Sequence, residues 1–97
     1  MDVAVAPRKQ LARRHVAFFT KVDSARDVIL TGDFTGWATD RIHLRPTANG
    51  GWSGTLELAQ GDHEYRLIID GKWKDDDQNL VRVPNGFGTQ NCVLKVK

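Results

Sequence analysis

The stretch NGGWSGTLELAQGDHEYRLIIDG, residues 49–71, decides the fold class. Apolar and polar residues alternate in two of its segments, 52–58 and 65–69, and turn-forming residues lie before, between and after them. Alternation with a period of two places every second side chain on the same face of a strand. Asp70-Gly71 is the best hairpin signal in the chain, because Gly adopts the positive φ angle of a primed turn. The stretch therefore predicts consecutive antiparallel strands.

Similar short segments occur on both sides of this stretch, and none of them has a helical pattern. The further strand candidates are residues 16–22, 28–30, 42–44, 80–83 and 91–96. Arg45-Pro46 is expected to end the third of them, because Pro removes a ladder donor. About seven short strands with frequent turns predict an all-β fold, an immunoglobulin-like antiparallel β-sandwich of the early-set type. A small barrel remains the alternative, because both architectures alternate inward and outward residues.

The length and charge of the chain indicate one domain with a basic lead-in. Its 97 residues suffice for a single core. Residues 1–14 hold four cations and one acid, whereas ten Lys and Arg stand against eleven Asp and Glu from His15 onward. We expect a basic, flexible N-terminal arm, residues 1–14, and a β-sandwich domain, residues 15–97. The balanced charge of this domain predicts no nucleic-acid partner.

Cysteine usage and hydropathy indicate the compartment. Cys92 is the one cysteine, and it alternates with Leu94 and Val96, which predicts a buried thiol in a reducing environment. No apolar run has the length of a membrane span, and the N-terminus has no apolar stretch typical of a secretory signal. We therefore expect a cytoplasmic protein with no membrane partner.

No recognisable catalytic or metal-binding motif is present. His43, His63 and Glu64 form no nucleophile and base arrangement, so we expect no enzyme activity and no cofactor. A calcium loop starting at Asp75 would have Leu80 where glycine is required and Gly86 where glutamate is required. We expect no metal site there, but a solvated acidic loop in which one aspartate holds the backbone.

Two of the three tryptophans do not follow the strand pattern. Trp52 is in phase with the apolar residues of its strand and is expected in the core, whereas Trp37 and Trp73 each follow a glycine turn. Exposed indoles suit a flat apolar partner such as the face of a sugar ring, with polar groups around the rim. The alternation along their strands predicts that Arg66 and Asn91 point away from the core. They are either hydrogen-bond partners of sugar hydroxyls or plain surface residues.

Four segments carry a resemblance to a known family: VILTGDFTGW (28–37), GDHEYR (61–66), IDGKW (69–73) and FGTQN (87–91). Together they resemble the glycogen-binding domain of the AMP-activated kinase β subunit and the early-set domain preceding isoamylases and glycogen branching enzymes, carbohydrate-binding module family 48. The resemblance covers about residues 15–97. It implies an immunoglobulin-like β-sandwich that binds α-1,4-linked glucan.

The resemblance also implies which residues bind the sugar. Trp37 and Trp73 would be stacking platforms, Arg66 the basic residue and Phe87 an apolar neighbour of the sugar, while Thr89 and Asn91 would bind hydroxyls. The chain departs from the kinase pattern in having Arg66 instead of lysine, Gln90 and Cys92 beside Asn91, and Thr35-Gly36 instead of an Asn pair. Arg and Lys present donors differently, so these departures bear on chain-length preference and hydrogen bonding.

These observations lead to a main functional hypothesis and two others. The first is a non-catalytic module for α-1,4-glucan, as glycogen, starch or maltodextrin, with a Kd of about 10 μM to 1 mM for a short oligosaccharide. The second is a protein-interaction β-sandwich that uses the two tryptophans as anchors. The third, which overlaps the first, is a regulatory partner of a glucan-metabolising enzyme or kinase.

Overall fold

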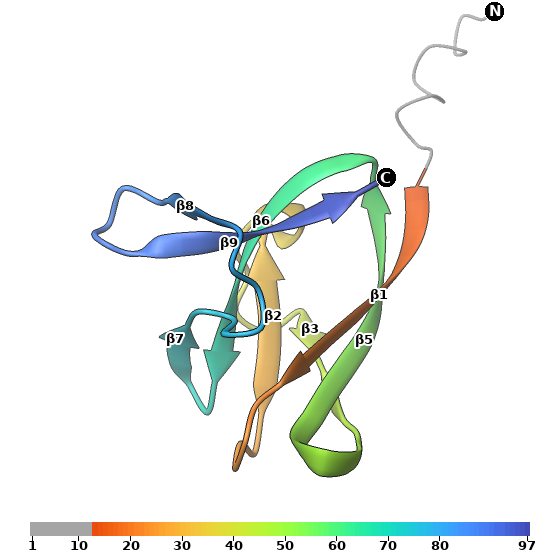
Figure 1. The fold of residues 1–97 in the computed structure, drawn as a ribbon, viewed down its shortest axis with the longest axis vertical. Helices are drawn as coiled ribbons and strands as arrows, with labels where there is room; N and C mark the ends of the chain where they lie inside the picture. Colours follow the sequence, from red (N-terminus) through yellow and green to blue (C-terminus); the bar gives the residue numbers. More distant parts are fainter. Residues whose placement is uncertain (1–12) are drawn as a thin grey trace, which may run out of the picture.

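The computed structural model describes residues 13–97, which form nine short strands and two 3₁₀ turns (Figure 1). The strands are β1 (Arg13–Lys21), β2 (Val28–Gly32), β3 (Ile42–His43), β4 (Arg45–Pro46), β5 (Gly51–Ala59), β6 (Gly61–Ile69), β7 (Lys72–Lys74), β8 (Arg82–Pro84) and β9 (Gln90–Val96). The turns are η1 (Asp33–Thr35) and η2 (Ala48–Gly50). The all-β prediction is confirmed, although the number of strands exceeds the expected seven.

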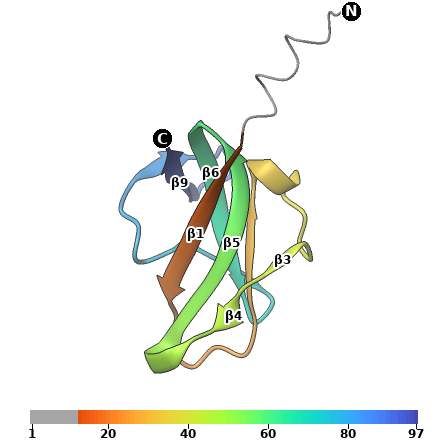
Figure 2. The same ribbon diagram turned by 90° about the vertical axis from the view of Figure 1, so that its right-hand side faces the viewer.

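Two antiparallel sheets form the layers of a sandwich. One has the order β1-β5-β4, and the other has the order β3-β2-β6-β9-β8, with β7 also paired to β6. Figure 2 shows β1 and β5 in front of β6 and β9. The open ends of both sheets exclude the barrel alternative, because a barrel closes one sheet on itself.

The segment 42–46 departs from the prediction, because it contributes a strand to each sheet. His43 pairs with Ile29 of β2, whereas Pro46 pairs with Trp52 of β5. Leu44, between the two short strands, is buried in the core. Pro46 therefore does not end the pairing. A proline is tolerated here because β4 is an edge strand, in which an N–H group is not needed on the open side.

Strand β1 begins two residues before the expected start of the sandwich. Arg13 pairs with Ala59 and Arg14 pairs with Leu58. The Arg14 Nε also donates to the carbonyl oxygen of Lys97 at 3.1 Å. Ladder hydrogen bonds use the backbone alone, so a strand can extend past the apolar alternation that predicts it. Residues 1–12, the remainder of the predicted arm, lie outside the described residues.

The inward residues of both sheets form one core. It contains Phe18, Val28, Leu30, Leu44, Trp52, Leu56, Leu58, Tyr65, Leu67, Cys92 and Val96. Trp52 is buried and Cys92 is inaccessible, which confirms both predictions. The rings of Phe18 and Tyr65 meet edge to face with centroids 5.3 Å apart, a favourable geometry for aromatic pairs. Phe18 lies on β1 and Tyr65 on β6, so this contact joins the two sheets.

A buried carboxylate also joins the sheets. Asp76 accepts hydrogen bonds from the hydroxyls of Thr20 on β1 and Tyr65 on β6, both at 2.6 Å, and from the backbone N–H of Gln78 at 3.0 Å. Burial, together with the hydrogen bond to Asp76, raises the pKa of Tyr65, so its hydroxyl remains a donor. One aspartate of the acidic loop holds the backbone as predicted, but this residue is buried instead of solvated.

The predicted strand over residues 80–83 is shorter in the structure. Leu80 and Val81 are exposed, and only β8 pairs with β9 through ladder partners such as Val83 and Asn91. The side chain of Asn79 donates to the carbonyl oxygen of Val93 at 2.9 Å and accepts from the backbone N–H of Val81 at 2.9 Å. These polar contacts fix the loop, so it needs no inward apolar side chains.

Candidate functional site

Strand β6 changes partner at Arg66. On one edge, residues 61–65 pair with β9, whereas residues 67–69 pair with β7. Glu64, Arg66 and Ile68 alternate onto the same face of β6. Trp73 is the ladder partner of Ile68, and directly opposed residues in a ladder project to the same face of the sheet. The register therefore brings Trp73 to the face that carries Arg66.

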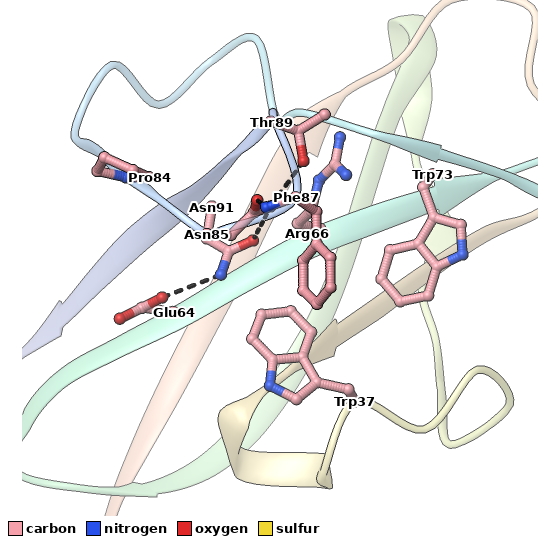
Figure 3. Close-up of a pocket in the computed structure, with 9 residues that line it drawn as sticks. All are labelled: Trp37, Glu64, Arg66, Trp73, Pro84, Asn85, Phe87, Thr89 and Asn91. Carbon is pink, nitrogen blue, oxygen red and sulfur yellow. Dashed lines mark hydrogen bonds between the residues drawn. The ribbon is translucent and has the colours of Figure 1, made fainter.

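This face contains a cavity of about 680 Å³. It is lined by Trp37, Glu64, Arg66, Trp73, Pro84, Asn85, Phe87, Thr89 and Asn91 (Figure 3). All six residues singled out from the sequence are therefore brought together. Three lining residues were not predicted, namely Glu64, Pro84 and Asn85. In the view of Figure 3 the Phe87 ring lies between the two indoles.

Trp37 is held by the turn that follows β2. Its backbone φ angle is 61°, in the left-handed region, and its N–H donates to the carbonyl oxygen of Gly32 at 2.9 Å. A Cβ atom on Gly32 would lie 2.4 Å from the carbonyl oxygen of Glu64, so only glycine permits this close approach. A left-handed non-glycine residue costs about 1–3 kcal/mol and marks a position fixed by its surroundings.

Trp73 is positioned by the predicted hairpin. Asp70 and Gly71 both have positive φ angles, 50° and 84°, as a type I′ turn requires, and Trp73 is 45% exposed on β7. The Asp70 carboxylate accepts from the backbone N–H groups of Arg26 and Asp27, both at 2.9 Å. These hydrogen bonds hold the pKa of Asp70 below its usual value and fasten the hairpin to the turn between β1 and β2.

Phe87 projects from the loop between β8 and β9 and is 89% exposed. The side chain of Asn85 spans this loop: its Nδ2 donates to the Thr89 hydroxyl at 2.7 Å and to the Asn91 Oδ1 at 3.1 Å. Its Oδ1 accepts from the Phe87 N–H at 3.0 Å. Asn85 therefore orients three of the predicted site residues at once, and its position in a Pro-Asn-Gly turn was the available sequence signal.

Asn91 lines the cavity but is only 6% exposed. Its Nδ2 donates to the Glu64 Oε1 at 2.9 Å, while its Oδ1 accepts from Asn85. The outward phase predicted for Asn91 is correct, but the loop residues that cover it leave little of it exposed to solvent. Its carboxamide is thus fixed from both ends.

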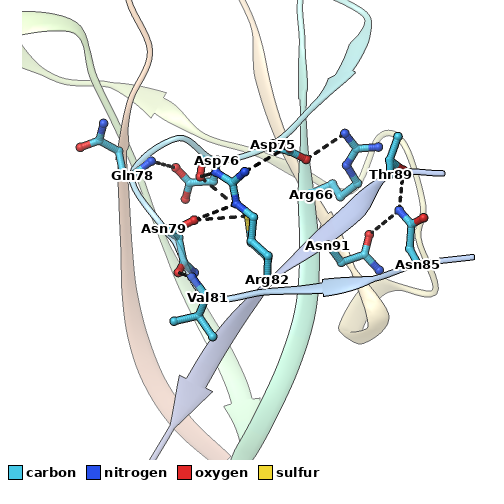
Figure 4. A network of polar contacts seen from close by, with 11 residues as sticks. Arg66, Asp75, Asp76, Gln78, Asn79, Val81, Arg82, Asn85, Thr89 and Asn91 are labelled. Atoms are coloured by element: carbon cyan, nitrogen blue, oxygen red, sulfur yellow. Dashed lines mark hydrogen bonds and ion pairs between the residues drawn. The ribbon is translucent and has the colours of Figure 1, made fainter. Parts of the chain in front are cut away.

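Arg66 is also less free than an outward strand residue would be. Its Nη2 donates to the Asp75 Oδ1 at 3.1 Å, and the Arg82 Nη1 lies 3.4 Å from the Asp75 Oδ2 (Figure 4). Arg82 is fixed in turn by the carbonyl oxygens of Asp76 and Asn79. The Arg66 side chain is 14% exposed, and its buried Nε has no hydrogen-bond partner within residues 13–97.

The arrangement combines aromatic faces with oriented hydrogen-bonding groups, which is the chemistry that recognises a sugar ring. Within residues 13–97 no cluster of three His, Cys, Asp or Glu side chains is placed to hold a metal ion. Nor does this described part of the chain contain a helix long and apolar enough to cross a membrane. Fold and site together define a carbohydrate-binding module, a non-catalytic class of domain.

The comparison with protein families gives the particular family. Residues 17–97 match the family described as the glycogen recognition site of AMP-activated protein kinase, and the chain belongs to it. This match confirms the resemblance found in the sequence.

Individual relatives agree with this assignment. The chain is 32% identical over 97 residues to the 5′-AMP-activated protein kinase subunit beta-2 of Mus musculus. The aligned region is all of this chain and 34% of that protein. The chain is 29% identical over 89 residues to the subunit beta-1 sequence of Sus scrofa, or 92% of this chain and 70% of that sequence. It is 38% identical over 72 residues to protein PTST homolog 2, chloroplastic, of Arabidopsis thaliana, or 74% of this chain and 13% of that protein.

Proposed function

We propose that this domain binds α-1,4-linked glucan, in glycogen, starch or maltodextrin, through Trp37, Arg66, Trp73, Phe87, Thr89 and Asn91. The observation that carries the proposal is their convergence on one cavity from four separate parts of the sequence. Three of these residues are aromatic and three are polar, as a ligand with apolar ring faces and a hydroxyl rim requires.

The three aromatic rings supply the stacking surface. Trp73 and Phe87 are exposed although large and apolar, and Trp37 lines the same cavity. By analogy with nucleobase stacking, each ring in contact contributes about 1–3 kcal/mol. The α-1,4 linkage curves the glucan chain, so that several sugar units can enter one concave site, whereas a β-1,4-linked chain is extended.

The polar residues supply hydrogen bonds whose geometry is set before the ligand arrives. The Thr89 hydroxyl accepts a hydrogen bond from Asn85, which leaves its own proton for a sugar oxygen. Arg66 is held by Asp75 and has further N–H groups to donate. Fixing these side chains beforehand lowers the entropy lost on binding.

The test is a titration of the protein with maltoheptaose by calorimetry and intrinsic tryptophan fluorescence, with cellohexaose as the control. We expect saturable binding of maltoheptaose with a Kd of about 10 μM to 1 mM and no response to cellohexaose. Absence of any response to maltoheptaose at several millimolar would refute the glucan assignment. It would favour the alternative in which Trp73 and Phe87 anchor a protein partner.

For the whole protein we propose a non-catalytic role that brings a glucan-metabolising enzyme or a kinase to its glucan. The chain spans 13% and 34% of the Arabidopsis and mouse relatives, and two relatives are named as kinase subunits. We also propose a cytoplasmic location, supported by the buried free thiol of Cys92. The location of a fluorescent fusion protein in cells tests this proposal. Import of the fusion into chloroplasts, the compartment in the name of one relative, would contradict it.

A further inference from the structure

Glu64 is the one acidic residue among the described residues that line the cavity. It lies two residues before Arg66 on β6, so both side chains share the outer face of the sheet. The Glu64 Oε1 accepts a hydrogen bond from the Asn91 Nδ2 at 2.9 Å (Figure 3). No donor within residues 13–97 contacts its other carboxylate oxygen, Oε2. Asn91 thus orients the carboxylate through Oε1, and Oε2 can accept a hydrogen bond from a ligand.

The charges around the cavity do not favour an anion. Arg66 is the one cation that lines it within the described residues, and its guanidinium is paired with the Asp75 carboxylate at 3.1 Å. Arg82 also contacts Asp75, but it does not line the cavity and it donates to the carbonyl oxygens of Asn79 and Asp76. Asp75 therefore offsets the charge of Arg66 at the cavity wall, and the Glu64 carboxylate adds a negative charge that no basic side chain of the described residues pairs.

We propose that Glu64 is a further glucan-contacting residue that determines specificity: its free oxygen accepts hydroxyl groups of a neutral α-glucan and disfavours glucans that carry phosphate monoesters. The inference rests on the proposed function of the site and adds the charge class of its ligand.

The physical basis is the difference between a hydroxyl and a phosphate as a neighbour of a carboxylate. A carboxylate only accepts, so a sugar hydroxyl donates to it in a short, charge-assisted hydrogen bond. A phosphate monoester carries a charge of about −1.5 to −2 at neutral pH and repels a carboxylate nearby. At the distance across a sugar unit and in moderate salt, this repulsion weakens binding by about threefold.

The experiment compares maltoheptaose with maltoheptaose phosphorylated at one C6 hydroxyl, each titrated calorimetrically into wild type, Glu64→Gln and Glu57→Gln at about 50 mM NaCl, where charge screening is modest. The carboxamide in Glu64→Gln keeps the carbonyl oxygen that Asn91 contacts and removes the charge. Glu57→Gln makes the same change in net charge on β5, where Glu57 is exposed in the other sheet. Urea denaturation of each variant checks that the fold is kept.

Wild type and Glu57→Gln are expected to bind the phosphorylated sugar about threefold more weakly than the neutral one. Glu64→Gln is expected to bind the neutral sugar more weakly than wild type and to bring the ratio of the two Kd values close to one. A wild-type ratio near one, or a ratio that Glu64→Gln leaves unchanged, overturns this inference. Failure of wild type to bind neutral maltoheptaose would instead overturn the proposed function, so the two failures are distinguishable.

Discussion

The interior around Asp76 and the cavity around Arg66 both contain networks of polar groups. They differ in how many of those groups have hydrogen-bond partners. Asp76 is buried and accepts from two hydroxyls and a backbone N–H, so both its oxygens have partners. At the cavity, the Arg66 Nε and the Glu64 Oε2 have no hydrogen-bond partner in the described part of the chain. A satisfied network stabilises a fold, whereas an unused acceptor that is not buried, such as the Glu64 Oε2, is available to a ligand; the Arg66 Nε is buried and is not.

The three tryptophans show the same division. Trp52 is in the core, whereas Trp73 is half exposed on the short strand β7. Changes in the interior should therefore lower the free energy of unfolding, and changes at the cavity should lower glucan affinity with little effect on unfolding. Substitutions in the two regions test this separation, beginning with the largest expected effect.

Replacing the core tryptophan should have the largest effect on stability. Trp52→Ala removes a buried aromatic ring and leaves a cavity, which lowers the free energy of unfolding by about 3–5 kcal/mol. Urea denaturation followed by circular dichroism measures this loss. Trp73→Ala is the matched control, since it deletes the same side chain from an exposed position and should change the unfolding free energy by less than about 1 kcal/mol. Equal losses in the two variants would contradict the division between interior and cavity.

Removing the buried carboxylate should be the next most destabilising change. Asp76→Ala leaves the hydroxyls of Thr20 and Tyr65 buried without their acceptor, which lowers the free energy of unfolding by about 2–4 kcal/mol. Asp77→Ala, at the exposed neighbouring position in the same loop, should leave the urea midpoint close to that of wild type. If Asp77→Ala proved the more destabilising variant, the assignment of Asp76 as the link between the sheets would fail.

At the cavity, the loss should appear in binding. Trp73→Ala should weaken maltoheptaose binding by at least about tenfold, because a stacking ring contributes about 1–3 kcal/mol. Calorimetry measures the Kd, and Trp73→Phe, which keeps an aromatic face, should retain part of the affinity. An unchanged Kd for the alanine variant would show that Trp73 is not a platform.

The smallest expected effect is a pH dependence at the hairpin that carries Trp73. Hydrogen bonds from the backbone of Arg26 and Asp27 hold the folded-state pKa of Asp70 below the reference value of 3.8. The carboxylate therefore contributes stability above about pH 3.8, and this contribution is lost as the pH falls through the lower folded-state pKa. Asp70→Asn tolerates the positive φ angle but removes the charge.

Urea denaturation between about pH 2 and 7, a range that spans this titration, measures the difference in stability between wild type and Asp70→Asn. The difference should be greatest near neutral pH and shrink in acid. Thr39→Ser, at an exposed position with no titratable side chain, is the control and should show no such trend. A difference that grows as the pH falls would contradict the role assigned to Asp70.

Period-two alternation predicted the main strands and the burial of Trp52 and Cys92, because inward and outward positions follow directly from strand geometry. The short strand β3 lies within the predicted segment 42–44, but β4 at Arg45–Pro46 could not be predicted in this way, since it has two residues and its pairing depends on which sheet edge is free. The burial of Asp76 was also missed, because its hydroxyl partners lie on β1 and β6, outside its own loop.

For the site, the resemblance supplied six of the nine residues that line the cavity. The strand pattern alone had singled out Trp37 and Trp73, which follow glycine turns, and the outward direction of Arg66 and Asn91. Phase could also have found Glu64, which shares its face with Arg66, whereas Asn85 acts through contacts that depend on the folded loop. The pairing of Arg66 with Asp75 joins residues nine apart across a hairpin, a distance that no local pattern predicts.

The central claim is that two tryptophans bind glucan and the third supports the fold. The most direct test is a ¹H–¹⁵N NMR titration with maltoheptaose that follows the three indole N–H signals, assigned by single Trp→Phe variants. The structure predicts large, saturable shifts for Trp37 and Trp73 and almost none for Trp52. A shift of Trp52 that exceeds those of the other two, or no shift of any indole signal while the sugar binds, would contradict this claim.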